Sequence, residues 1–600
     1  MMSSDSSVST SLSERSVHGA TLGRMVLEAT RRHTGTAARF PRDGNVVEWS
    51  YAELGLAVRE TATGLVARGL RPGDRLALLS STRAEWTLVD CAALCAGATL
   101  VPIYETSSPE ECAYVLAHSE ARFLVVENAA QLEKIEEIRA SCPALEHIFA
   151  TEPTAGVASI ASLRTPADDT ALETIQRDIA ADAVATIVYT SGTTGPPKGC
   201  MLTHANVLST MEMYEGRVPA SEPMVLFMFL PLAHALARAA QMMTLDVGGT
   251  LAFWGGDPKR LLEDVAEASP THLPAVPRLF EKIHTRAIGS VEDAGGAKLR
   301  LFTWALAVGA RMRAAERAGG ADVVLRAQYA VADRLVLAKV RALFGRRLRL
   351  AVTGAAPISR DVLEFFDACG VLLLEGYGMT ETCAAATLNT DAAFRFGTVG
   401  QPLPGTDVRV TAEGEVLLRG PNVFPGYYRD PEATRGTFTD GWLATGDLGT
   451  VDDDGFLQIT GRKKDLIITS SGKNVAPGNI EAALRESRWI SEAVIFGDAR
   501  SYLVALVTLD PEEAAALALE LELGPDLDVA ALSAHPQVHA RLEADVAAAN
   551  ERFARIEQIK RFGILDHDLT LAQGELTPTL KIKRAIIYDR YREDFERLYA

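Results

Sequence analysis

The most constraining feature of the sequence is a regular alternation of short apolar runs and longer helical patterns over its first four hundred residues. Each run is followed by a segment of helical period or by a Gly/Pro turn. This rhythm is typical of parallel sheets whose faces are covered by helices. Near-continuous apolar runs such as VLFMFLP predict strands buried on both faces. The expected strands include Arg75–Ser80, Arg122–Val126, Val184–Tyr189, Val225–Leu230, Leu348–Thr353 and Val371–Leu374.

The pattern changes after about Gly400. Short alternating runs separated by Gly/Asp turns predict a small antiparallel β subdomain, with strands at Asp407–Thr411, Glu415–Arg419 and Gly455–Thr460. Beyond the polar stretch GRKKDLIITSSGKN, helix and strand patterns begin again, so we expect a domain boundary at Gly461–Asp465. At about 150 residues per domain, 600 residues exceed one compact core. We predict a disordered tail at 1–20, a large α/β domain at 21–463 and a smaller α+β domain at 464–600.

The composition excludes several classes of protein. The formal net charge of −18 argues against a uniformly basic nucleic-acid binder. The longest uncharged runs fall short of the ~20 apolar residues that a membrane-spanning helix needs. The polar N-terminal stretch lacks the apolar core of a secretory signal. Seven cysteines without a CxxC pair indicate reduced, buried thiols, and we therefore expect a cytoplasmic protein.

One segment departs from the acidic balance. Residues 298–349 have a helical pattern and carry twelve basic and three acidic residues, a net charge of +9 that leaves −27 for the rest of the chain. Two interpretations stay open at this point. The segment forms a basic face that recruits an anionic membrane surface, CoA or fatty acid, or it is a solvated helical insert whose arginines pack on neighbouring residues.

A run of hydroxyl residues and glycines follows the strand that ends at Tyr189. Hydroxyl groups can donate to an anion, glycines let backbone N–H groups approach it closely, and a lysine adds positive charge. The run lacks the G-x-x-x-x-G-K-[ST] pattern of a Walker A loop. We therefore predict a different phosphate-binding loop, formed by Thr190, Ser191, Gly192, Thr193, Thr194 and Lys198.

This loop and four later motifs resemble those of the acyl-adenylate-forming (AMP-binding) superfamily, most closely its long-chain fatty acyl-CoA synthetases. The resemblance covers nearly the whole chain from about residue 25. It rests on TSGTTGPPKG at 190–199, EGYGMTE at 375–381, GDLG at 446–449, GRKKDLIITSSGKNVAP at 461–477 and TPTLKIKR at 577–584. It implies an N-terminal adenylation domain and a mobile C-terminal domain.

The resemblance also implies roles in nucleotide binding. Tyr377 stacks on adenine, Thr380 contacts the α-phosphate, and Glu381 holds Mg²⁺. Asp447 accepts the ribose hydroxyl groups, and Arg462 contacts the ribose. The other members of the implied ATP/AMP site are Gly354, Ala355, Ala356, Glu375, Gly376 and Gly378, and the family usually has more glycine at the first three.

Catalytic residues are implied in the same way. Thr380 and Glu381 act on the phosphates, and His234 resembles the histidine near the acyl entrance. The family's mobile lysine aligns with Lys581, whose ammonium could neutralise charge as a carboxylate attacks phosphorus. Lys583 is the competing assignment, because both lysines lie on one face of an extended segment.

Three further residues with implied roles, Lys464, Gly472 and Lys473, lie near the domain boundary. Lys464 matches the family's hinge, about which the C-terminal domain rotates between half-reactions. The glycine loop containing Gly472 and Lys473 resembles the part that approaches CoA in the second half-reaction.

The implied activity has two steps. A fatty carboxylate attacks the α-phosphorus of MgATP to give acyl-AMP and pyrophosphate, and CoA then takes the acyl group and releases AMP. Alternatives are a fatty acyl-AMP ligase that serves a carrier protein, another carboxylate-activating enzyme, or a catalytically inactive nucleotide-binding relative. Fatty acid, ATP and CoA are the expected partners, with no nucleic acid. Family precedent allows a homodimer, and peripheral membrane contact is open through 298–349.

Overall fold

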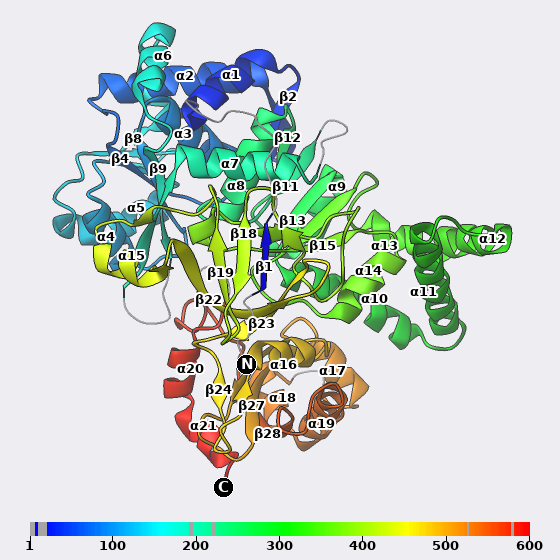
Figure 1. Ribbon diagram of the computed structural model, residues 1–600. Helices are drawn as coiled ribbons and strands as arrows, with labels where there is room; N and C mark the ends of the chain where they lie inside the picture. The colour runs from blue at the N-terminus through cyan, green and yellow to red at the C-terminus, as the bar shows by residue number, and fades with distance from the viewer. Residues whose placement is uncertain (1–5, 10–20, 191–195, 219–223, 525–526, 578–580) are drawn as a thin grey trace.

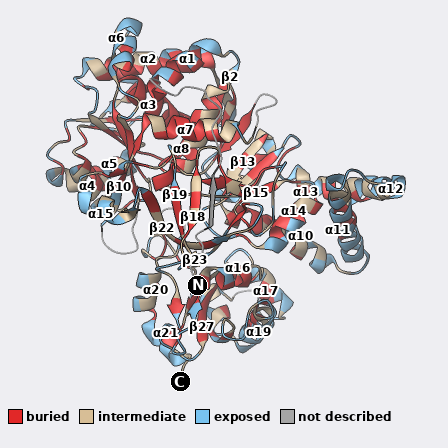
Figure 2. Ribbon diagram, viewed as in Figure 1, coloured by how far each residue is buried: buried red, intermediate tan, exposed pale blue. Residues whose placement is uncertain are grey.

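The computed structural model describes residues 6–9, 21–190, 196–218, 224–524, 527–577 and 581–600. Its larger part contains two helix-covered sheets and an antiparallel sheet, and the smaller C-terminal part lies against one side of it (Figure 1). The predicted α/β class is confirmed. Figure 2 shows that buried residues follow the strands and the helices between the sheets.

The first sheet is parallel except at one edge. Strands β9, β5, β4, β6, β7 and β8 run parallel, whereas β10 pairs with both β9 and β20 in antiparallel fashion. In order across the sheet the strands are β20 (Gly426–Tyr427), β10 (Lys198–Thr203), β9 (Val184–Thr190), β5 (Thr99–Ile103), β4 (Arg75–Leu79), β6 (Phe123–Val126), β7 (His147–Ala150) and β8 (Ala158–Ser159).

The second sheet has a parallel centre and antiparallel edges. Strands from β15 to β2 are parallel, and β3, β16 and β17 pair in antiparallel fashion at the ends. In order the strands are β17 (Gln401–Pro402), β16 (Thr387–Leu388), β15 (Leu373–Tyr377), β14 (Leu350–Thr353), β13 (His272–Ala275), β11 (Val225–Met228), β12 (Thr250–Phe253), β2 (Thr36–Arg42) and β3 (Asn45–Ser50). All of β11 is buried, as its apolar run predicts.

Helices fill the space around both sheets. Helix α3 is buried along its whole length, because apolar residues occupy every side of it. Capping boxes begin three of these helices: Ser50 with Glu53 at α2, Ser108 with Glu111 at α4, and Thr203 with Asn206 at α7. The helices of this part are α1 (Leu22–Arg32), α2 (Tyr51–Ala67), α3 (Ala84–Cys95), α4 (Pro109–Ser119), α5 (Ala129–Ile138), α6 (Asp169–Asp178), α7 (His204–Glu215), α8 (Ala235–Asp246), α9 (Leu261–Ala268), α10 (Pro277–Ala294), α14 (Arg360–Ala368) and α15 (Pro431–Thr437).

An antiparallel sheet follows in the chain, as the change of pattern after Gly400 predicts. Its strands are β18 (Asp407–Val410), β19 (Glu415–Arg419), β21 (Phe438–Thr439), β22 (Trp442–Val451) and β23 (Leu457–Arg462). The structure differs from the sequence expectation at Ser6–Ser9, which were included in a disordered tail. These residues form strand β1, which pairs with β18. The rest of the predicted tail, 1–5 and 10–20, lies outside the described residues.

The C-terminal part has its own core. Its sheets consist of β24 (Ile467–Ile468) with β25 (Asn474–Val475), and of β26 (Ile490–Phe496), β27 (Leu503–Leu509) and β28 (Ile559–Ile564). Apolar residues from these strands and from α16 and α19 form one cluster, and Val494, Val504 and Leu506 belong to a second cluster. The helices are α16 (Pro477–Leu484), α17 (Ala514–Glu520), α18 (Val529–Ser533), α19 (Pro536–Asn550), α20 (Arg584–Arg590) and α21 (Arg592–Arg597).

The basic segment is helical, as predicted. It comprises α11 (Gly296–Arg317), α12 (Val323–Ala332), a π-helical turn at Asp333–Leu337 and α13 (Ala338–Ala342). Helices α11 and α12 project from the body as an arm (Figure 1). All seven cysteines are free and buried, as expected. Among the described residues, no helix is both long enough and apolar enough to cross a membrane.

Ion pairs connect the large part to the C-terminal part. Lys282 Nζ lies 2.5 Å from a Glu512 carboxylate oxygen, and Arg286 lies 3.5 Å from the other. Arg278 lies 3.6 Å from Asp510. The three basic residues come from one helix, α10, so this helix presents a positive surface to acidic residues that follow β27.

Candidate active site

The hairpin of β9 and β10 carries the predicted phosphate loop. Thr190 ends β9, Lys198 begins β10, and the two residues pair across the hairpin. Residues 191–195, which include the expected Ser191, Gly192, Thr193 and Thr194, lie outside the described residues. The ammonium of Lys198 lies 5.1 Å from the centre of the Tyr427 ring, since β20 pairs with β10.

The Tyr427 hydroxyl group connects this edge to the predicted magnesium ligand. It donates a 2.7 Å hydrogen bond to Glu381 Oε1. Glu381 and Thr380 lie on a short 3₁₀ turn, Thr380–Thr382, and both are buried. Tyr427 therefore lies between Lys198 and Glu381, and it was not anticipated from the sequence because it belongs to no motif.

A second group forms around Asp447. The Tyr377 hydroxyl donates to Asp447 Oδ2 at 2.7 Å, and Arg462 Nε donates to Asp447 Oδ1 at 2.8 Å. Burial and the Asp447 charge raise the pKa of Tyr377. Asp447 is 5% exposed and lies opposite Arg462 in the pairing of β22 with β23. The structure thus brings together the three residues expected at adenine and ribose.

The opposite wall forms where β14 and β15 end together. A Cβ on Gly354 would approach the carbonyl oxygen of Gly376 to 2.8 Å, so only glycine fits there. Ala355 has φ of +71°, in the left-handed region that favours glycine. Because alanine is strained in this conformation, the positive φ explains why the family usually has more glycine at these positions. Glu375 accepts a bond from the Gly397 amide at 3.3 Å, and burial raises the pKa of Glu375 to about 8.

His234 caps helix α8, and its Nδ1 accepts from the Leu236 amide at 3.3 Å. Burial and then the charge of Lys581 lower the pKa of His234 to about 4, so the imidazole is neutral at pH 7. One turn later, Arg238 is buried and forms two hydrogen bonds with buried Asp90, at 2.6 and 3.0 Å. Arg238 therefore supports α8 through Asp90.

Lys581 reaches this site from the C-terminal part. Loss of surrounding water lowers the pKa of Lys581 most, the Arg462 guanidinium lowers it further, and the carboxylates of Asp447 and Glu381 raise it. Lys581 is exposed to solvent. The charged groups that change the pKa of its ammonium are therefore Arg462, Asp447 and Glu381. The charge of Lys581 also lowers the pKa of His234.

The remaining predicted positions are exposed. Lys464 is exposed and follows β23, where the chain passes to the C-terminal part. Gly472 and Lys473 are exposed in the turn between β24 and β25, where Gly472 has φ of +74°. No hydrogen bond or ion pair joins this turn to Asp447 or Glu381 among the residues described.

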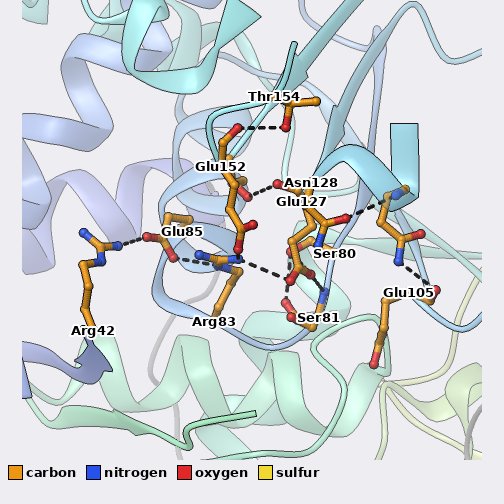
Figure 3. Close-up of polar contacts among 12 residues, drawn as sticks. Arg42, Ser80, Ser81, Arg83, Glu85, Glu105, Glu127, Asn128, Glu152 and Thr154 are labelled. Carbon is orange, nitrogen blue, oxygen red and sulfur yellow. Dashed lines mark hydrogen bonds and ion pairs between the residues drawn. The ribbon is translucent and has the colours of Figure 1, made fainter. Parts of the chain in front are cut away.

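A charged network supports the site from the first sheet and was missed by sequence reasoning. Arg83 pairs with Glu85 at 2.9 Å, Glu127 at 3.3 Å and Glu152 at 2.5 Å (Figure 3). The neighbouring Thr82 hydroxyl donates to the Leu230 carbonyl at 2.8 Å and accepts from the Leu232 amide at 2.9 Å. Thr82 thus joins the chain that follows β4 to the loop that leads to His234.

An apolar cavity of about 840 Å³, including its open mouth, lies between helices α7 and α8 and strands β11, β13 and β14. Its walls are almost entirely hydrocarbon. At Ala384 it reaches the loop that begins with Thr380 and Glu381. The residues that line it include Met211, Tyr214, Leu226, Ala240, Met243, Leu273 and Val352.

The acidic groups suit a magnesium ion that arrives with its substrate. Among the described residues, no cluster of three His, Cys, Asp or Glu side chains could hold a metal. Mg²⁺ typically uses one or two carboxylates together with substrate phosphates and water. Glu381 supplies one buried carboxylate near Lys198, which fits that arrangement.

Two family models match this chain. The model of the AMP-binding enzymes matches residues 27–428, and that of the AMP-binding enzyme C-terminal domain matches 464–600. The chain belongs to the AMP-binding enzyme family. This AMP-binding enzyme therefore has the family identity that its motifs predicted.

Similar proteins agree with this assignment. A long-chain-fatty-acid–CoA ligase of Mycobacterium bovis is 39% identical over 562 residues, which are 93% of this chain and 93% of that protein. A peroxisomal long chain acyl-CoA synthetase of Arabidopsis thaliana is 31% identical over 602 residues, 95% of this chain and 84% of that protein.

Among solved structures, the adenylation domain of a carboxylate reductase from Mycobacterium chelonae gives a TM-score of 0.76 at 22% identity, covering 97% of this chain and 91% of that one. The o-succinylbenzoate coenzyme A synthetase of Bacillus subtilis, solved with ATP and a magnesium ion, gives 0.65 at 22% identity and covers 94% and 98%. At this identity the likeness concerns the fold.

Proposed function

We propose that this enzyme is a long-chain fatty acid–CoA ligase. It would convert a fatty carboxylate and MgATP to acyl-AMP and pyrophosphate, and then transfer the acyl group to CoA. The observation that carries the proposal is the hydrogen-bonded group of Tyr377, Asp447 and Arg462, together with an apolar cavity that reaches the loop after Glu381. The names of the relatives, long-chain fatty acid ligases, support the same substrate class.

In the first half-reaction a carboxylate oxygen attacks the α-phosphorus, and pyrophosphate leaves. Charge spreads over the phosphate oxygens, so positioned cations lower the barrier without a protein nucleophile. We assign that role to Lys198 and Lys581, with Thr380 at the α-phosphate. Glu381 would hold the Mg²⁺, which supplies further neutralisation of phosphate charge. Neutral His234 would face the substrate carboxylate without forming an ion pair with it.

The cavity would hold the hydrocarbon chain. Each methylene group removed from water contributes about 0.8 kcal/mol, so an apolar cavity favours long alkyl chains over small polar acids. Met211 and Met243 suit this task because methionine side chains adapt to irregular contents. Ala384 would mark the carboxylate end, since it lies next to the Glu381 turn.

The second half-reaction requires Lys581 to leave, because CoA must reach the acyl carbonyl. We propose that residues 464–600 rotate about Lys464 relative to 21–463. This motion would bring the Gly472–Lys473 turn to the CoA side, where the lysine could contact an anionic group. CoA, a cytoplasmic location, and peripheral membrane contact through 298–349 belong to the same proposal, as does a homodimer permitted by family precedent.

The decisive test measures AMP release from purified enzyme with carboxylates of increasing chain length, with and without CoA. We expect the highest turnover with long fatty acids and CoA, with an acyl-CoA product. Acyl-AMP accumulation without CoA-dependent turnover would indicate a ligase serving a carrier protein. Preference for aryl or amino acids would indicate another carboxylate-activating enzyme, and ATP binding without pyrophosphate release an inactive relative.

A cavity variant sharpens this test. Ala240→Phe adds a ring to the cavity wall contributed by α8, so turnover of long chains should fall while short chains are still used. The short-chain substrate is the internal control for correct folding. Equal loss with all chain lengths would contradict the assignment of the cavity to the acyl group.

A further inference from the structure

The projecting arm has one face in the core and one in solvent. Residues 323–342 form a continuous helix, with α12, the π-helical turn and α13 in succession. On the inner face, Ala332, Leu337 and Val340 are buried in a cluster with residues of α11 and α14. The outer face is free of neighbours in Figure 1 and is exposed in Figure 2.

Large apolar side chains occupy that outer face. Val324 is 66% exposed and Val331 51%, and the spacing of seven residues places them on one side of α12, while Leu335, in the π-helical turn that follows, is 44% exposed. Val323, at the end of the helix, is 81% exposed. Single exposed apolar residues are ordinary in proteins, but a stripe of them on one helix marks a contact surface. We call these four residues the α12 stripe.

Exposed cations accompany the α12 stripe. Arg326, Arg334 and Lys339 are exposed and have no ion-pair partner among the described residues. Other arginines of the basic segment are engaged: Arg317 pairs with Asp367, and Arg341 lies 2.7 Å from Asp333. The basic segment thus contains both arginines packed on neighbouring residues and cations exposed to solvent. The unpaired cations lie on the helix that carries the apolar stripe.

The exposed apolar side chains and the unpaired cations together indicate the kind of partner that this surface would bind. A helix with an apolar face and flanking cations binds at the interface of anionic membranes, where apolar side chains insert and cations meet headgroups. A second copy of the chain is a poorer occupant. Stripe-on-stripe contact about a two-fold axis would bring Arg326, Arg334 and Lys339 of both copies together, and opposed like charges disfavour association.

We propose that the α12 stripe inserts into the surface of an anionic lipid bilayer and holds the enzyme there. The inference rests on the proposed function in one respect, since a fatty acid substrate partitions into membranes. The net charge of −27 outside the basic segment would be repelled by the same surface, so the arm would orient the enzyme with its acidic body away from the lipid.

The first experiment measures co-sedimentation of the full chain with vesicles of phosphatidylcholine, with and without phosphatidylglycerol. We expect binding to the anionic vesicles, weakened by salt, and loss by about tenfold or more in Val324→Asp/Val331→Asp. Leu519→Asp is the matched control, because Leu519 is 79% exposed on α17 of the C-terminal part. Arg326→Gln/Arg334→Gln should reduce binding and its dependence on salt.

A second measurement reports insertion directly. Because all seven native cysteines are buried, a cysteine introduced as Val324→Cys can be labelled selectively with a polarity-sensitive dye. Its emission should shift to the blue on anionic vesicles, whereas the dye on Leu519→Cys should not respond. Absence of wild-type binding to anionic vesicles, equal loss in Leu519→Asp, or an unshifted dye would overturn the proposal. So would a wild-type dimer that the stripe variant converts to a monomer.

Failure of this proposal is distinguishable from failure of the proposed ligase function. In vesicle-free solution with a water-soluble medium-chain carboxylate, Val324→Asp/Val331→Asp should retain wild-type AMP release. Loss of that activity would mean that the variant is misfolded or that the arm serves another purpose, and it would count against the membrane role. Retained activity with lost vesicle binding supports it.

Discussion

Glutamate 512 offers a direct test of how the C-terminal part is held. In the structure its carboxylate accepts Lys282 at 2.5 Å and Arg286 at 3.5 Å, both from helix α10 of the large part. In the same arrangement the charges of Asp447 and Glu381 raise the pKa of Lys581. Glu512→Gln keeps the shape of the side chain and removes its charge, so both pairs across the boundary are weakened together.

The free energy that these ion pairs contribute depends on how exposed their side chains are. The Lys282, Arg286 and Glu512 side chains are 36%, 52% and 48% exposed, so each pair is worth about 0.2–1 kcal/mol. Loss of two pairs should shift the balance between this arrangement and a rotated one by about 0.4–2 kcal/mol, which is about two- to thirtyfold. The shift should shrink at high salt, because exposed pairs are screened.

The assay compares the two half-reactions in the same preparation. Pyrophosphate release with fatty acid and MgATP reports the first, and thioester formation from supplied acyl-AMP and CoA reports the second. We expect the ratio of first to second to fall in Glu512→Gln. The control is Glu520→Gln, which breaks a pair with Arg541 inside the C-terminal part. An unchanged ratio, or an equal change in the control, would refute the reasoning.

Three further predictions concern the site and its support. Lys581→Ala should reduce acyl-AMP formation by about 10²-fold or more yet still convert supplied acyl-AMP and CoA to thioester; equal loss in both assays would contradict the separate role. Glu381→Gln should weaken MgATP-dependent pyrophosphate exchange more than thermal stability, and Tyr427→Phe, which removes one hydrogen bond to that carboxylate, should have a smaller effect of about tenfold or less. Burial and then the charge of Arg238 lower the pKa of His204 from 6.5 to about 4. Between these two pH values the folded protein binds fewer protons than the unfolded chain. The folded state therefore loses stability as the pH falls from 6.5 to about 4. Denaturant titrations at several pH values should show that His204→Gln reduces this loss of unfolding free energy by up to about 3 kcal/mol. The same loss in the variant and in the wild type at low pH would contradict the assignment to His204.

Much of the fold could be predicted from local pattern. The expected strand Arg75–Ser80 is observed as β4, Arg75–Leu79, and the expected strand Val184–Tyr189 is observed as β9, Val184–Thr190. Apolar runs specify strands because both faces are buried, whatever the partner strand. Partner choice is less local. The antiparallel pairing of β10 with β9 and of β1 with β18 depends on edges that the sequence pattern does not reveal.

The site could be predicted only where motifs name its residues. Tyr377, Asp447 and Arg462 belong to motifs, and the structure brings them together. Tyr427 and Thr82 belong to none, since their contribution arises from what tertiary packing places beside them. For the same reason, the +9 charge of 298–349 could not indicate which of its cations are paired.

The distribution of strong and weak contacts favours a C-terminal part that moves as a unit. On either side of Lys581 the chain is anchored inside that part: Glu575, fully buried, accepts Arg590 at 2.8 Å, and Arg584 donates to buried Glu481 at 2.5 Å. Breaking a largely buried pair such as Arg584–Glu481 costs about 3–5 kcal/mol. Across the boundary, the pairs with Glu512 are exposed and cost far less to break, whereas Arg485 lies 4.0 Å from Glu281 and both side chains are largely buried. A rotation would have to break the contact of Arg485 with Glu281 as well as the exposed pairs, while the Arg584–Glu481 pair would keep the chain beside Lys581 attached to the C-terminal part.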